Sequence, residues 1–509
     1  MNDPFYITTP IYYVNDSPHM GGAYTTISAD VAARWHRLLG DDVMFLTGTD
    51  EHGLKLQRAA QEQEMSPQEL VDFYSKRYIE TWSDLNISND DFVRTTEPRH
   101  KVAVQALLQK VYDNGFIELN TYEGLYCVAC EAYYTEDDLI DGLCKFHNKP
   151  VETVKEENYF FKLSAFQDRL AKYYEENPQA IEPLSRRNEV LSFINSGLRD
   201  FSISRSSLSW GIPIPWDQKH VTYVWFDALT NYITALEYPN IDSDLYKKFW
   251  PGVHFVGKDI LRFHAVYWPA MMMAAELEPP KQVFAHGFLT VGGEKMSKSK
   301  ANQIVPSDLT PTFGVDGYRY HFVADQRFGG DGDFSYEQMV ARYNSDLANN
   351  FGNLTARVLN MAIKYCDGLS TDKRANGPLK NAIAQTFEKC ETLMGEFNFS
   401  EFHKTIWELI GACNSYIEQT EPFKMAKEDM AGAQAVLGDC LEALRAICLF
   451  AYPAMPATCE ELWRRLGLNI DTPIDKVQLP RDLEWGSMPA GLPLEKGEPL
   501  FPRIVADES

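Results

Sequence analysis

The chain has 509 residues, which is too long for one hydrophobic core, so several domains are expected. Its 45% hydrophobic and 24% charged residues are typical of a globular protein, and no apolar run reaches the roughly 20 residues needed to span a bilayer. The formal net charge of −24 argues against a general nucleic-acid binder, although a local basic face could still hold an RNA substrate.

The N-terminus and the cysteines both favour a cytoplasmic protein. The chain enters an apolar segment at Phe5 without the basic region of a signal peptide. Nine cysteines in so long a chain do not make a disulfide scaffold, and a reducing compartment fits them best.

The first 40 residues have the pattern of a strand, a turn and a helix. Residues 5–9 predict a buried strand, and a helical pattern opens at His19 with Gly21 and Gly22. Backbone N–H groups and the positive helix end then meet at one point, which favours a phosphate. Taken alone, a histidine at such a helix start is more often a cap.

A second predicted strand, residues 43–48, leads into Asp50. Ligands of open parallel sheets bind at the carboxyl ends of strands, so Asp50 is a candidate for binding the α-ammonium group of a substrate. The alternative is an N-cap for the helix that starts near Leu54, and both roles can hold together.

Residues 117–220 differ in character from the segments on either side and contain four spaced metal-binding side chains. Cys127, Cys130, Cys144 and His147 form a C-x₂-C…C-x₂-H arrangement. Three thiolates and an imidazole make a closed tetrahedral set, which predicts one structural Zn²⁺. The alternative is four unconnected residues. The other cysteines are interpreted as small buried apolar residues.

A loop rich in lysine follows at residues 295–299, with the sequence Lys-Met-Ser-Lys-Ser after two glycines. Lysine is a point charge on a flexible stem, so such a loop can close over a triphosphate and withdraw electron density from a leaving pyrophosphate. A solvated basic turn is the alternative for an isolated K-x-x-K.

Beyond the glycine-rich segment 329–333 the pattern becomes helical. Apolar residues recur at three- and four-residue steps from Leu347 to Tyr365, and further helical stretches follow at about 377–397, 401–420, 430–451 and 457–466. On the first helix Asn353 and Arg357 are four apart and project to one side, where they could read base edges. A surface helical pair is the alternative.

The lysine loop resembles the KMSKS loop of class I aminoacyl-tRNA synthetases. Pro18–Gly22 resembles their His-x-Gly-His element, with Gly22 in place of the second histidine. Residues 8–15, Asp50–Gly53, Tyr223–Ala228 and His254–Ile260 resemble the methionyl-tRNA synthetases specifically, as does the zinc-ligand spacing, which resembles their single-knuckle group.

The resemblance implies a site for each substrate. Phosphate catalysis would fall to His19, Lys295 and Lys298, with Mg²⁺ accompanying ATP. The remaining ATP contacts would be Gly21, Gly22, Gly257, Asp259, Met296 and Ser297. Beside Asp50, methionine would contact Ile11, Tyr13, Trp225, Ala228, Tyr232, Ile260 and His264, an apolar and aromatic set that suits a thioether. The anticodon would be read by Asn353, Arg357 and Phe423, the last standing where the family usually has tryptophan.

The implied fold is α/β: a Rossmann-type parallel-sheet catalytic domain, split by the zinc-knuckle insertion and followed by a helical anticodon-binding bundle. The expected segments are 1–116 and 221–290 for the catalytic halves, 117–220 for the insertion, 291–340 for the lysine loop and stem contact, 341–470 for the bundle, and 471–509 for a tail packed back on the catalytic half. The expected partners are ATP, L-methionine and tRNA(Met), and the expected state is a monomer. The rival hypotheses are another class I synthetase, such as cysteinyl, and an inactive RNA-binding relative.

Overall fold

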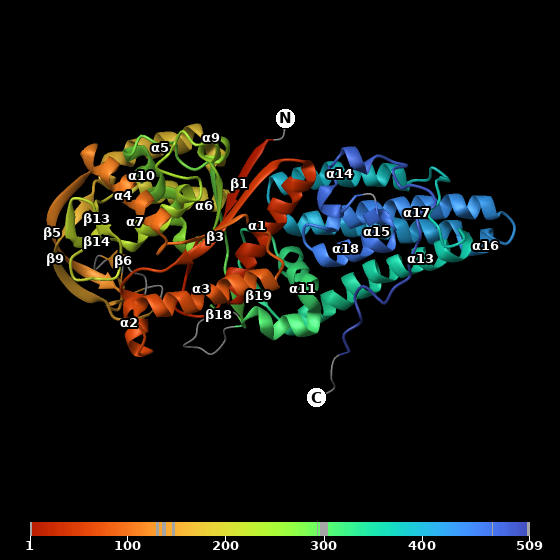
Figure 1. Cartoon of the computed structure of the whole chain (residues 1–509), viewed down its shortest axis with the longest axis horizontal. Coiled ribbons are helices and arrows are strands. Elements are labelled where there is room, and N and C mark those ends of the chain that lie inside the picture. Colours follow the sequence, from red (N-terminus) through yellow and green to blue (C-terminus); the bar gives the residue numbers. More distant parts are fainter. Residues whose placement is uncertain are drawn as a thin grey trace.

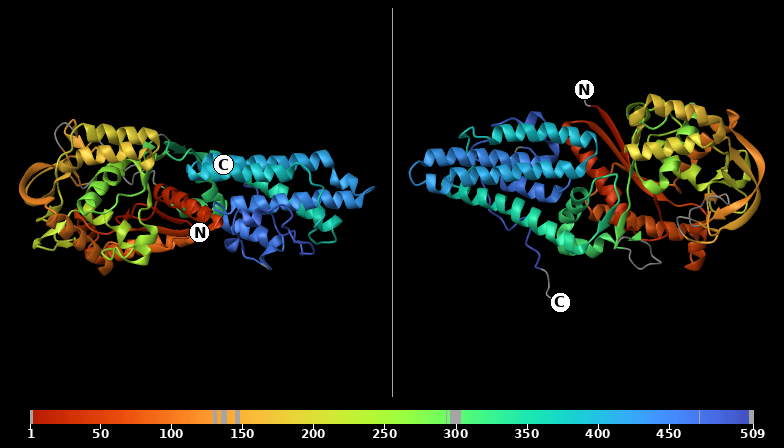
Figure 2. Two further views of the ribbon diagram at one scale, coloured as in Figure 1. Left: turned by 90° about the horizontal axis from the view of Figure 1, so that it is seen from above. Right: turned by 180° about the vertical axis from the view of Figure 1, so that it is seen from behind.

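The computed structural model describes residues 3–128, 132–134, 139–144, 148–292, 294–295, 304–470 and 472–505. Two bodies lie end to end along the long axis, an α/β body and a helical bundle, as the views in Figures 1 and 2 agree. No helix among these residues is long and apolar enough to cross a membrane.

A parallel sheet of seven strands organises the α/β body, in the order β10-β16-β15-β1-β3-β2 with β4 also paired to β3. The strands are β1 (Pro4–Thr8), β2 (Tyr12–Tyr13), β3 (Asp42–Asp50), β4 (Asp91–Arg94), β10 (Ile181–Glu182), β15 (Val253–Gly257) and β16 (Gln282–His286). Ile7 in β1 is in register with Phe45 in β3 and Val253 in β15. The carboxyl ends of β1, β3 and β15 therefore lie side by side.

Helix α1 (Met20–Leu39) is buried nearly all round, because it lies between the sheet and the helical bundle. Its small residues Ala29, Ala32 and Ala33 are fully buried, and its Trp35 packs edge-on against Phe402 of the bundle. The other helices of the α/β body are α2 (Leu54–Glu62), α3 (Pro67–Asp84), α4 (Pro98–Asp113), α5 (Gln167–Glu176), α6 (Leu184–Asn195), α7 (Val224–Leu229), α8 (Asn231–Thr234), α9 (Asp244–Phe249) and α10 (Trp268–Ala274).

The segment 117–220 starts as a long antiparallel ribbon of β5 (Ile117–Cys127) and β9 (Glu152–Phe161), which forms the outer edge of the α/β body (Figure 1). Its shorter strands are β6 (Ala132–Tyr134), β7 (Leu139–Ile140), β8 (Leu143–Cys144), β11 (Phe201–Ser202), β12 (Ser204–Arg205), β13 (Pro213–Ile214) and β14 (Asp217–Thr222). The later part of the segment returns to the main sheet, since β10 pairs in parallel with β16.

A small sheet and one long helix join the two bodies. β17 (Leu289–Val291) pairs with β18 (Glu294–Lys295) and with β19 (Gly332–Phe334). Helix α11 (Pro306–Asp325) follows and is broken at Gly314, whose φ of 67° is in the left-handed region. It contacts both α1 and the bundle.

The helices of the bundle pack around an apolar core that continues into the α/β body at α1. They are α12 (Tyr336–Arg342), which continues through a π-helical segment (Tyr343–Gly352) into α13 (Asn353–Tyr365), then α14 (Leu379–Gly395), α15 (Phe399–Thr420), α16 (Pro422–Met425), α17 (Met430–Ala451) and α18 (Pro456–Arg465). The parallel sheet and this bundle confirm the predicted α/β domain followed by a helical bundle.

The tail contacts both bodies. The Leu479 N–H donates to the Leu38 carbonyl at the end of α1, 2.6 Å apart. Farther on, Ile504 and the side chain of Asn344 in the bundle exchange two hydrogen bonds, of 2.8 and 2.9 Å.

Candidate functional site

His19 caps the first helix of the sheet. Its Nδ1 accepts from the Gly21 N–H at 3.0 Å, so the neutral ring carries its proton on Nε2. Met20 and the residues after it form the first turn of α1, where the helix dipole and backbone N–H groups favour an anion. A donor and a positive helix end therefore coincide at the carboxyl edge of the sheet.

Both described ends of the lysine loop are fixed near this helix start. On the near side, Lys295 pairs with Thr290 of β17. The strand before β17 is β16, which ends at His286, whose Nε2 is 2.8 Å from Thr25 Oγ1 of α1. On the far side, the Ile304 carbonyl accepts from the Met20 N–H at 2.9 Å. Met296, Ser297, Lys298 and the Lys295 side chain lie outside the described residues, so their phosphate contacts stay predictions.

Glycines at this edge have close neighbours. A Cβ at Gly257, the end of β15, would lie 2.6 Å from Asp259 Oδ1. A Cβ at Gly22 would lie 3.3 Å from the Tyr12 ring, and the Tyr12 hydroxyl donates to the Gly22 carbonyl at 3.1 Å. The ring of Tyr12 thus stands beside Gly22, the position at which the sequence departs from the His-x-Gly-His pattern that it resembles.

Asp50 ends β3 and is followed by two side chains in dense hydrogen-bond networks. The fully buried Glu51 accepts from Arg94 Nε, Thr49 Oγ1 and Ser75 Oγ at 2.5–2.7 Å and from Thr96. Its backbone carbonyl accepts from Trp210 Nε1, and the His52 carbonyl accepts from Tyr13. The loop that carries Asp50 is therefore held rigidly.

His52 also belongs to a buried histidine–aspartate–histidine cluster. Asp227 of α7 lies 2.7 Å from His52 Nδ1 and 2.7 Å from His100 Nε2. Although burial opposes it, His52 and His100 lower the pKa of Asp227 below its usual value, so the carboxylate stays charged. The sequence analysis missed Glu51, His100 and Asp227. Asp227 lies within the segment Tyr223–Ala228, but its partners His100 and His52 are 127 and 175 residues away in the sequence.

An aromatic cluster lies beside Asp227. The Tyr232 hydroxyl is 2.7 Å from His264 Nε2, while His264 Nδ1 donates to the Ile260 carbonyl at 3.0 Å. Trp225 stacks on Phe263 with the ring centres 3.8 Å apart. Burial lowers the pKa of His264 to about 4, so it is a neutral acceptor for Tyr232.

The remaining residues predicted for methionine border the same strand ends. Ala228 follows Asp227 on α7 and is buried, and Ile11 lies against Gly48 in β3. Tyr13, in β2, is half-buried. Ile11, Tyr13 and Asp50 thus come from one side of the sheet, and the α7–α10 region supplies the others.

The two described residues of the predicted zinc set, Cys127 and Cys144, end β5 and β8. Both are 1% exposed, and the Cys144 carbonyl accepts from the Asn148 N–H at 2.8 Å. Cys130 and His147 lie outside the described residues. Within the described part no group of three or more metal-binding side chains is present.

The predicted anticodon residues lie in the bundle. Asn353 is exposed at the start of α13, and Arg357 has 36% of its side chain exposed, with Nη1 3.8 Å from the Glu418 carboxylate. Phe423 in α16 is 39% exposed, which is unusual for a phenylalanine.

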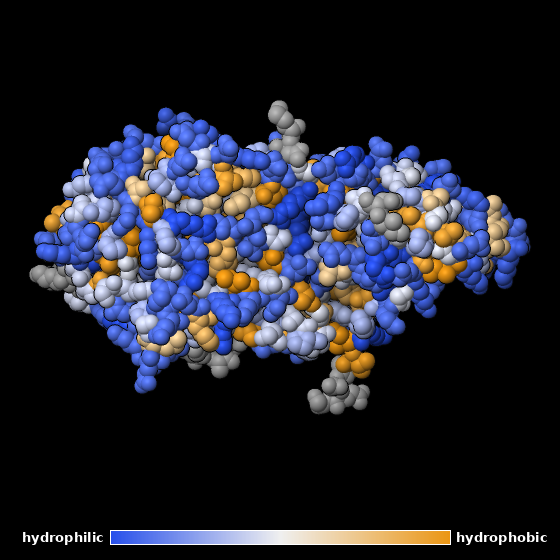
Figure 3. Space-filling model, in the orientation of Figure 1, coloured by the Kyte–Doolittle hydropathy of each residue, from blue (hydrophilic) through white to orange (hydrophobic). Residues whose placement is uncertain are grey.

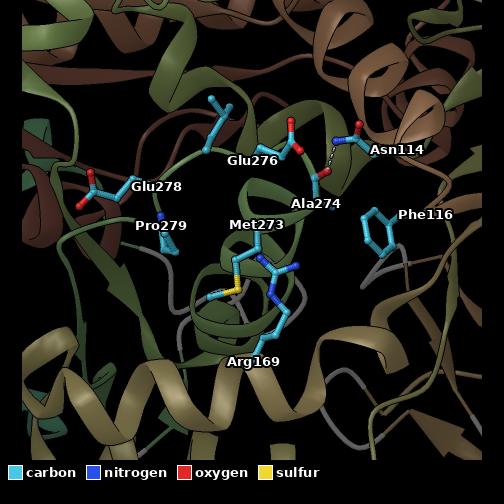
Figure 4. A pocket seen from close by; sticks show the side chains of 9 residues that line it. Asn114, Phe116, Arg169, Met273, Ala274, Glu276, Glu278 and Pro279 are labelled. Atoms are coloured by element: carbon cyan, nitrogen blue, oxygen red, sulfur yellow. Dashed lines mark hydrogen bonds between the residues drawn. The ribbon is translucent and has the colours of Figure 1, made fainter.

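A separate hollow of about 660 Å³ lies elsewhere in the α/β body (Figure 4). It is lined by residues such as Asn114, Arg169, Met273 and Glu276, and it contains none of the predicted site residues. Its segment 276–279 leads into the amino end of β16, so the hollow borders the edge of the sheet opposite to His19 and Asp50.

Comparisons with known proteins cover nearly the whole chain. A family model described as "tRNA synthetases class I (M)" matches residues 5–149 and 134–359, and one described as "Anticodon-binding domain of tRNA ligase" matches residues 379–483.

Relatives in bacteria are similar over the same length. The methionine–tRNA ligase of Caldanaerobacter subterraneus is 46% identical over all of this chain and 80% of its own length, and that of Streptomyces coelicolor is 46% identical over 98% and 96%. The structure of Mycobacterium tuberculosis methionyl-tRNA synthetase in complex with methionyl-adenylate superposes with a TM-score of 0.92 at 39% identity, covering 98% of this chain and all of the other.

Proposed function

Because this chain belongs to the class I methionine–tRNA ligases, we propose that it joins L-methionine to tRNA(Met) in two steps. The methionine carboxylate attacks the α-phosphate of ATP, which gives methionyl-adenylate and pyrophosphate. The methionyl group then passes to the terminal ribose of the tRNA. The observation that carries the proposal is the position of the chain on either side of the lysine loop: the Ile304 carbonyl after the loop accepts from Met20 at the His19 end of α1, and His286 before the loop lies beside Thr25 of the same helix.

In the first step the protein supplies charge and position rather than a covalent intermediate. His19 Nε2–H, the N-terminus of α1 and the ammonium groups of Lys295 and Lys298 would stabilise the negative charge that develops on the phosphates. Gly21, Gly22 and Gly257, together with Asp259, would border the nucleotide, with Met296 and Ser297 on the loop. Mg²⁺ enters with ATP and neutralises phosphate charge.

Methionine recognition divides between a charged and an apolar part. Asp50 would bind the α-ammonium group, and the networks of Glu51 and His52 would keep it in place. The cluster of Trp225, Tyr232 and His264 would surround the thioether, with Ile11, Tyr13, Ala228 and Ile260. Because His264 is uncharged, it can accept from Tyr232 without placing a cation beside the apolar side chain.

The metal and RNA sites are further parts of the proposal. One structural Zn²⁺ would be bound by Cys127, Cys130, Cys144 and His147; the burial of Cys127 and Cys144 fits thiolate ligands closed off from solvent. Asn353, Arg357 and Phe423 would contact the anticodon, which the exposure of the Phe423 ring supports because an exposed aromatic can stack on a base.

We also propose a cytoplasmic monomer. Exposed large apolar side chains, such as Val102, Leu184 and Phe423, are dispersed over several elements. On the face in Figure 3 apolar residues are likewise scattered among polar ones rather than gathered in one broad patch, which does not favour an obligate dimer.

Methionine-dependent exchange of pyrophosphate into ATP tests the first step, and charging of tRNA(Met) tests the second. We expect both from the native chain, and His19→Ala should lower kcat for exchange about 10²-fold or more while the protein remains folded. Exchange with another amino acid but not methionine would favour a different synthetase. No exchange in folded protein that still binds tRNA would favour an inactive relative, and full exchange in His19→Ala would refute the phosphate assignment.

A further inference from the structure

Arg319 is a charged side chain at the joint between the two bodies. It lies in the second half of α11 and is fully buried. All its nitrogens are bonded: Nε donates to the carbonyl of Ala454 (2.9 Å), Nη1 to the carbonyls of Leu85 (3.1 Å) and Asn86 (3.2 Å), and Nη2 to Asp30 Oδ2 (2.6 Å) and the carbonyl of Pro453 (2.9 Å).

These acceptors belong to two different bodies. Asp30, Leu85 and Asn86 are in the α/β body, whereas Pro453 and Ala454 connect α17 to α18 in the bundle. One planar group therefore bonds both bodies at once, so it restricts the angle between them as well as their separation.

Asp30 ties this joint to the helix that carries His19. Besides Arg319, Asp30 accepts from Arg34 Nε at 2.8 Å and from the N–H and hydroxyl of Ser88 at 2.7 and 2.6 Å. Although burial opposes it, Arg34 and Arg319 hold the pKa of Asp30 well below its usual value. The carboxylate is thus ionised and fully bonded inside α1.

Helix α11 extends from the lysine loop to the bundle. It starts two residues after Ile304, whose carbonyl accepts from the Met20 N–H. Past the break at Gly314, Asp316 Oδ2 accepts from the Thr458 N–H at 2.5 Å, at the start of α18. Helix α11 therefore starts beside the His19 end of α1 and the far end of the lysine loop, and it continues into contact with the bundle. It lies at the centre of Figure 1.

We propose that Arg319 is a positioning residue for the transfer step: it fixes the bundle relative to α1, so that a tRNA held by the bundle presents its terminal ribose to the adenylate. The inference rests on the proposed function. Adenylate formation needs only the α/β body and the lysine loop. Loss of the fixed angle should therefore affect transfer much more than exchange.

Arg319→Lys tests this proposal. Lysine keeps the charge but has three donors on one atom, so it cannot bond acceptors on both bodies in the same geometry. We expect methionine-dependent exchange to stay within about twofold of the native rate, while kcat for tRNA charging falls about tenfold or more with a small change in the KM for tRNA.

Arg465→Lys is the matched control. Arg465 is also a buried arginine with several acceptors, but these are Glu461 of α18 and the carbonyls of Lys496 and Glu498 in the tail, all outside the α/β body. The Arg465→Lys variant should lose a comparable amount of thermal stability, but its rates of exchange and of tRNA charging should change by similar factors. If charging fell more than exchange to the same degree in both variants, the cause would be a general loss of rigidity and the proposal would be overturned.

Asp316→Ala is the second variant and decides the matter if Arg319→Lys does not fold. It removes a different link between α11 and α18, so charging should again fall more than exchange, but by a smaller factor than in Arg319→Lys. Proportional loss of exchange and charging in the folded variants would overturn the positioning role. If the native chain itself showed neither reaction with methionine, the proposed function would fail instead, which is a distinguishable result.

Discussion

His264 illustrates how burial sets the chemistry of one side chain. Its Nδ1 proton is directed to the Ile260 carbonyl, which leaves Nε2 to accept from Tyr232. A protonated ring would lose that acceptor and would place a charge in an apolar cluster. Burial prevents this by lowering the pKa of His264 to about 4.

This lowered pKa makes a testable contribution to stability. In the unfolded chain a histidine has a pKa of about 6.5. Between pH 6.5 and pH 4 the unfolded state therefore binds a proton that the folded state does not, so stability falls as the pH falls through this window. At pH 5 the loss is about 2 kcal/mol for this one group.

His264→Gln removes the titrating group and keeps an amide oxygen as a possible acceptor for Tyr232. We expect the native Tm to drop more than the variant Tm when the pH is changed from 7.5 to 5.0, as measured by calorimetry. The other buried histidines are present in both proteins; of these, His254 has a pKa that is lowered by burial and, to a smaller extent, by His264. Equal drops in Tm would show that His264 is not held neutral.

The residues also show the limit of what local sequence predicts. Tyr232 and His264 both stand in apolar runs, and their pairing at 2.7 Å spans only 32 positions. The bond between Arg319 and Asp30 spans 289 positions and lies in no recognised motif. Nothing local distinguishes a buried arginine with five acceptors from a solvated one, because its partners are defined by the packing of two bodies.

At the scale of elements, periodicity predicted the long helices and buried strands well. The pattern 430–451 became α17 (Met430–Ala451), and 43–48 lies within β3 (Asp42–Asp50). The two-residue strand β10, which pairs with β16 from inside the segment 117–220, could not be predicted this way. So short a strand has no period, and only its place beside β16 defines it.

The end of the β5–β9 ribbon carries the zinc prediction. Away from the main sheet, a small lobe has little apolar core, so a structural metal would supply much of its folding free energy. We expect one zinc per chain by mass spectrometry of protein purified without chelator. Cys144→Ser should lose most of that zinc and lower the thermal stability.

Cys366→Ser is the control, because Cys366 is another buried cysteine but lies at the end of α13 in the bundle. It should retain the metal. Full zinc content in Cys144→Ser, or native protein without metal, would contradict the ligand assignment.

The whole molecule separates its proposed chemical site from its proposed RNA-reading site. His19, Asp50 and the aromatic cluster lie in the α/β body, whereas α13 and α16, which carry Arg357 and Phe423, are in the bundle at the other end of the long axis (Figure 1). This separation lets substitutions in the bundle change RNA binding without changing adenylate chemistry. It also fits the charge of −24, because only a local face has to attract phosphate.

For Arg357→Ala we therefore expect a change in the KM for tRNA, whereas for Arg319→Lys we expect a change in kcat. Its side chain is partly exposed, and its ion pair with Glu418 is long, at 3.8 Å. Such an exposed pair contributes little to stability, so the fold should be unaffected. If Arg357 contacts the anticodon, the KM for tRNA(Met) should rise about tenfold or more, because a lost side-chain contact to a base is worth about 1–3 kcal/mol. Exchange without tRNA should be unchanged.

Lys404→Ala serves as the control, since Lys404 is an exposed cation on α15 whose ion pair with Glu401 lies within its own helix. An unchanged KM in Arg357→Ala, or an equal rise in Lys404→Ala, would refute the anticodon assignment.

The two arginines then separate two requirements of one reaction: a residue that binds RNA at the far end changes KM, and a residue that sets the angle of the bundle changes kcat. A tRNA can be charged efficiently only if both are met, because binding at one end brings the ribose to the adenylate only through a joint of fixed geometry.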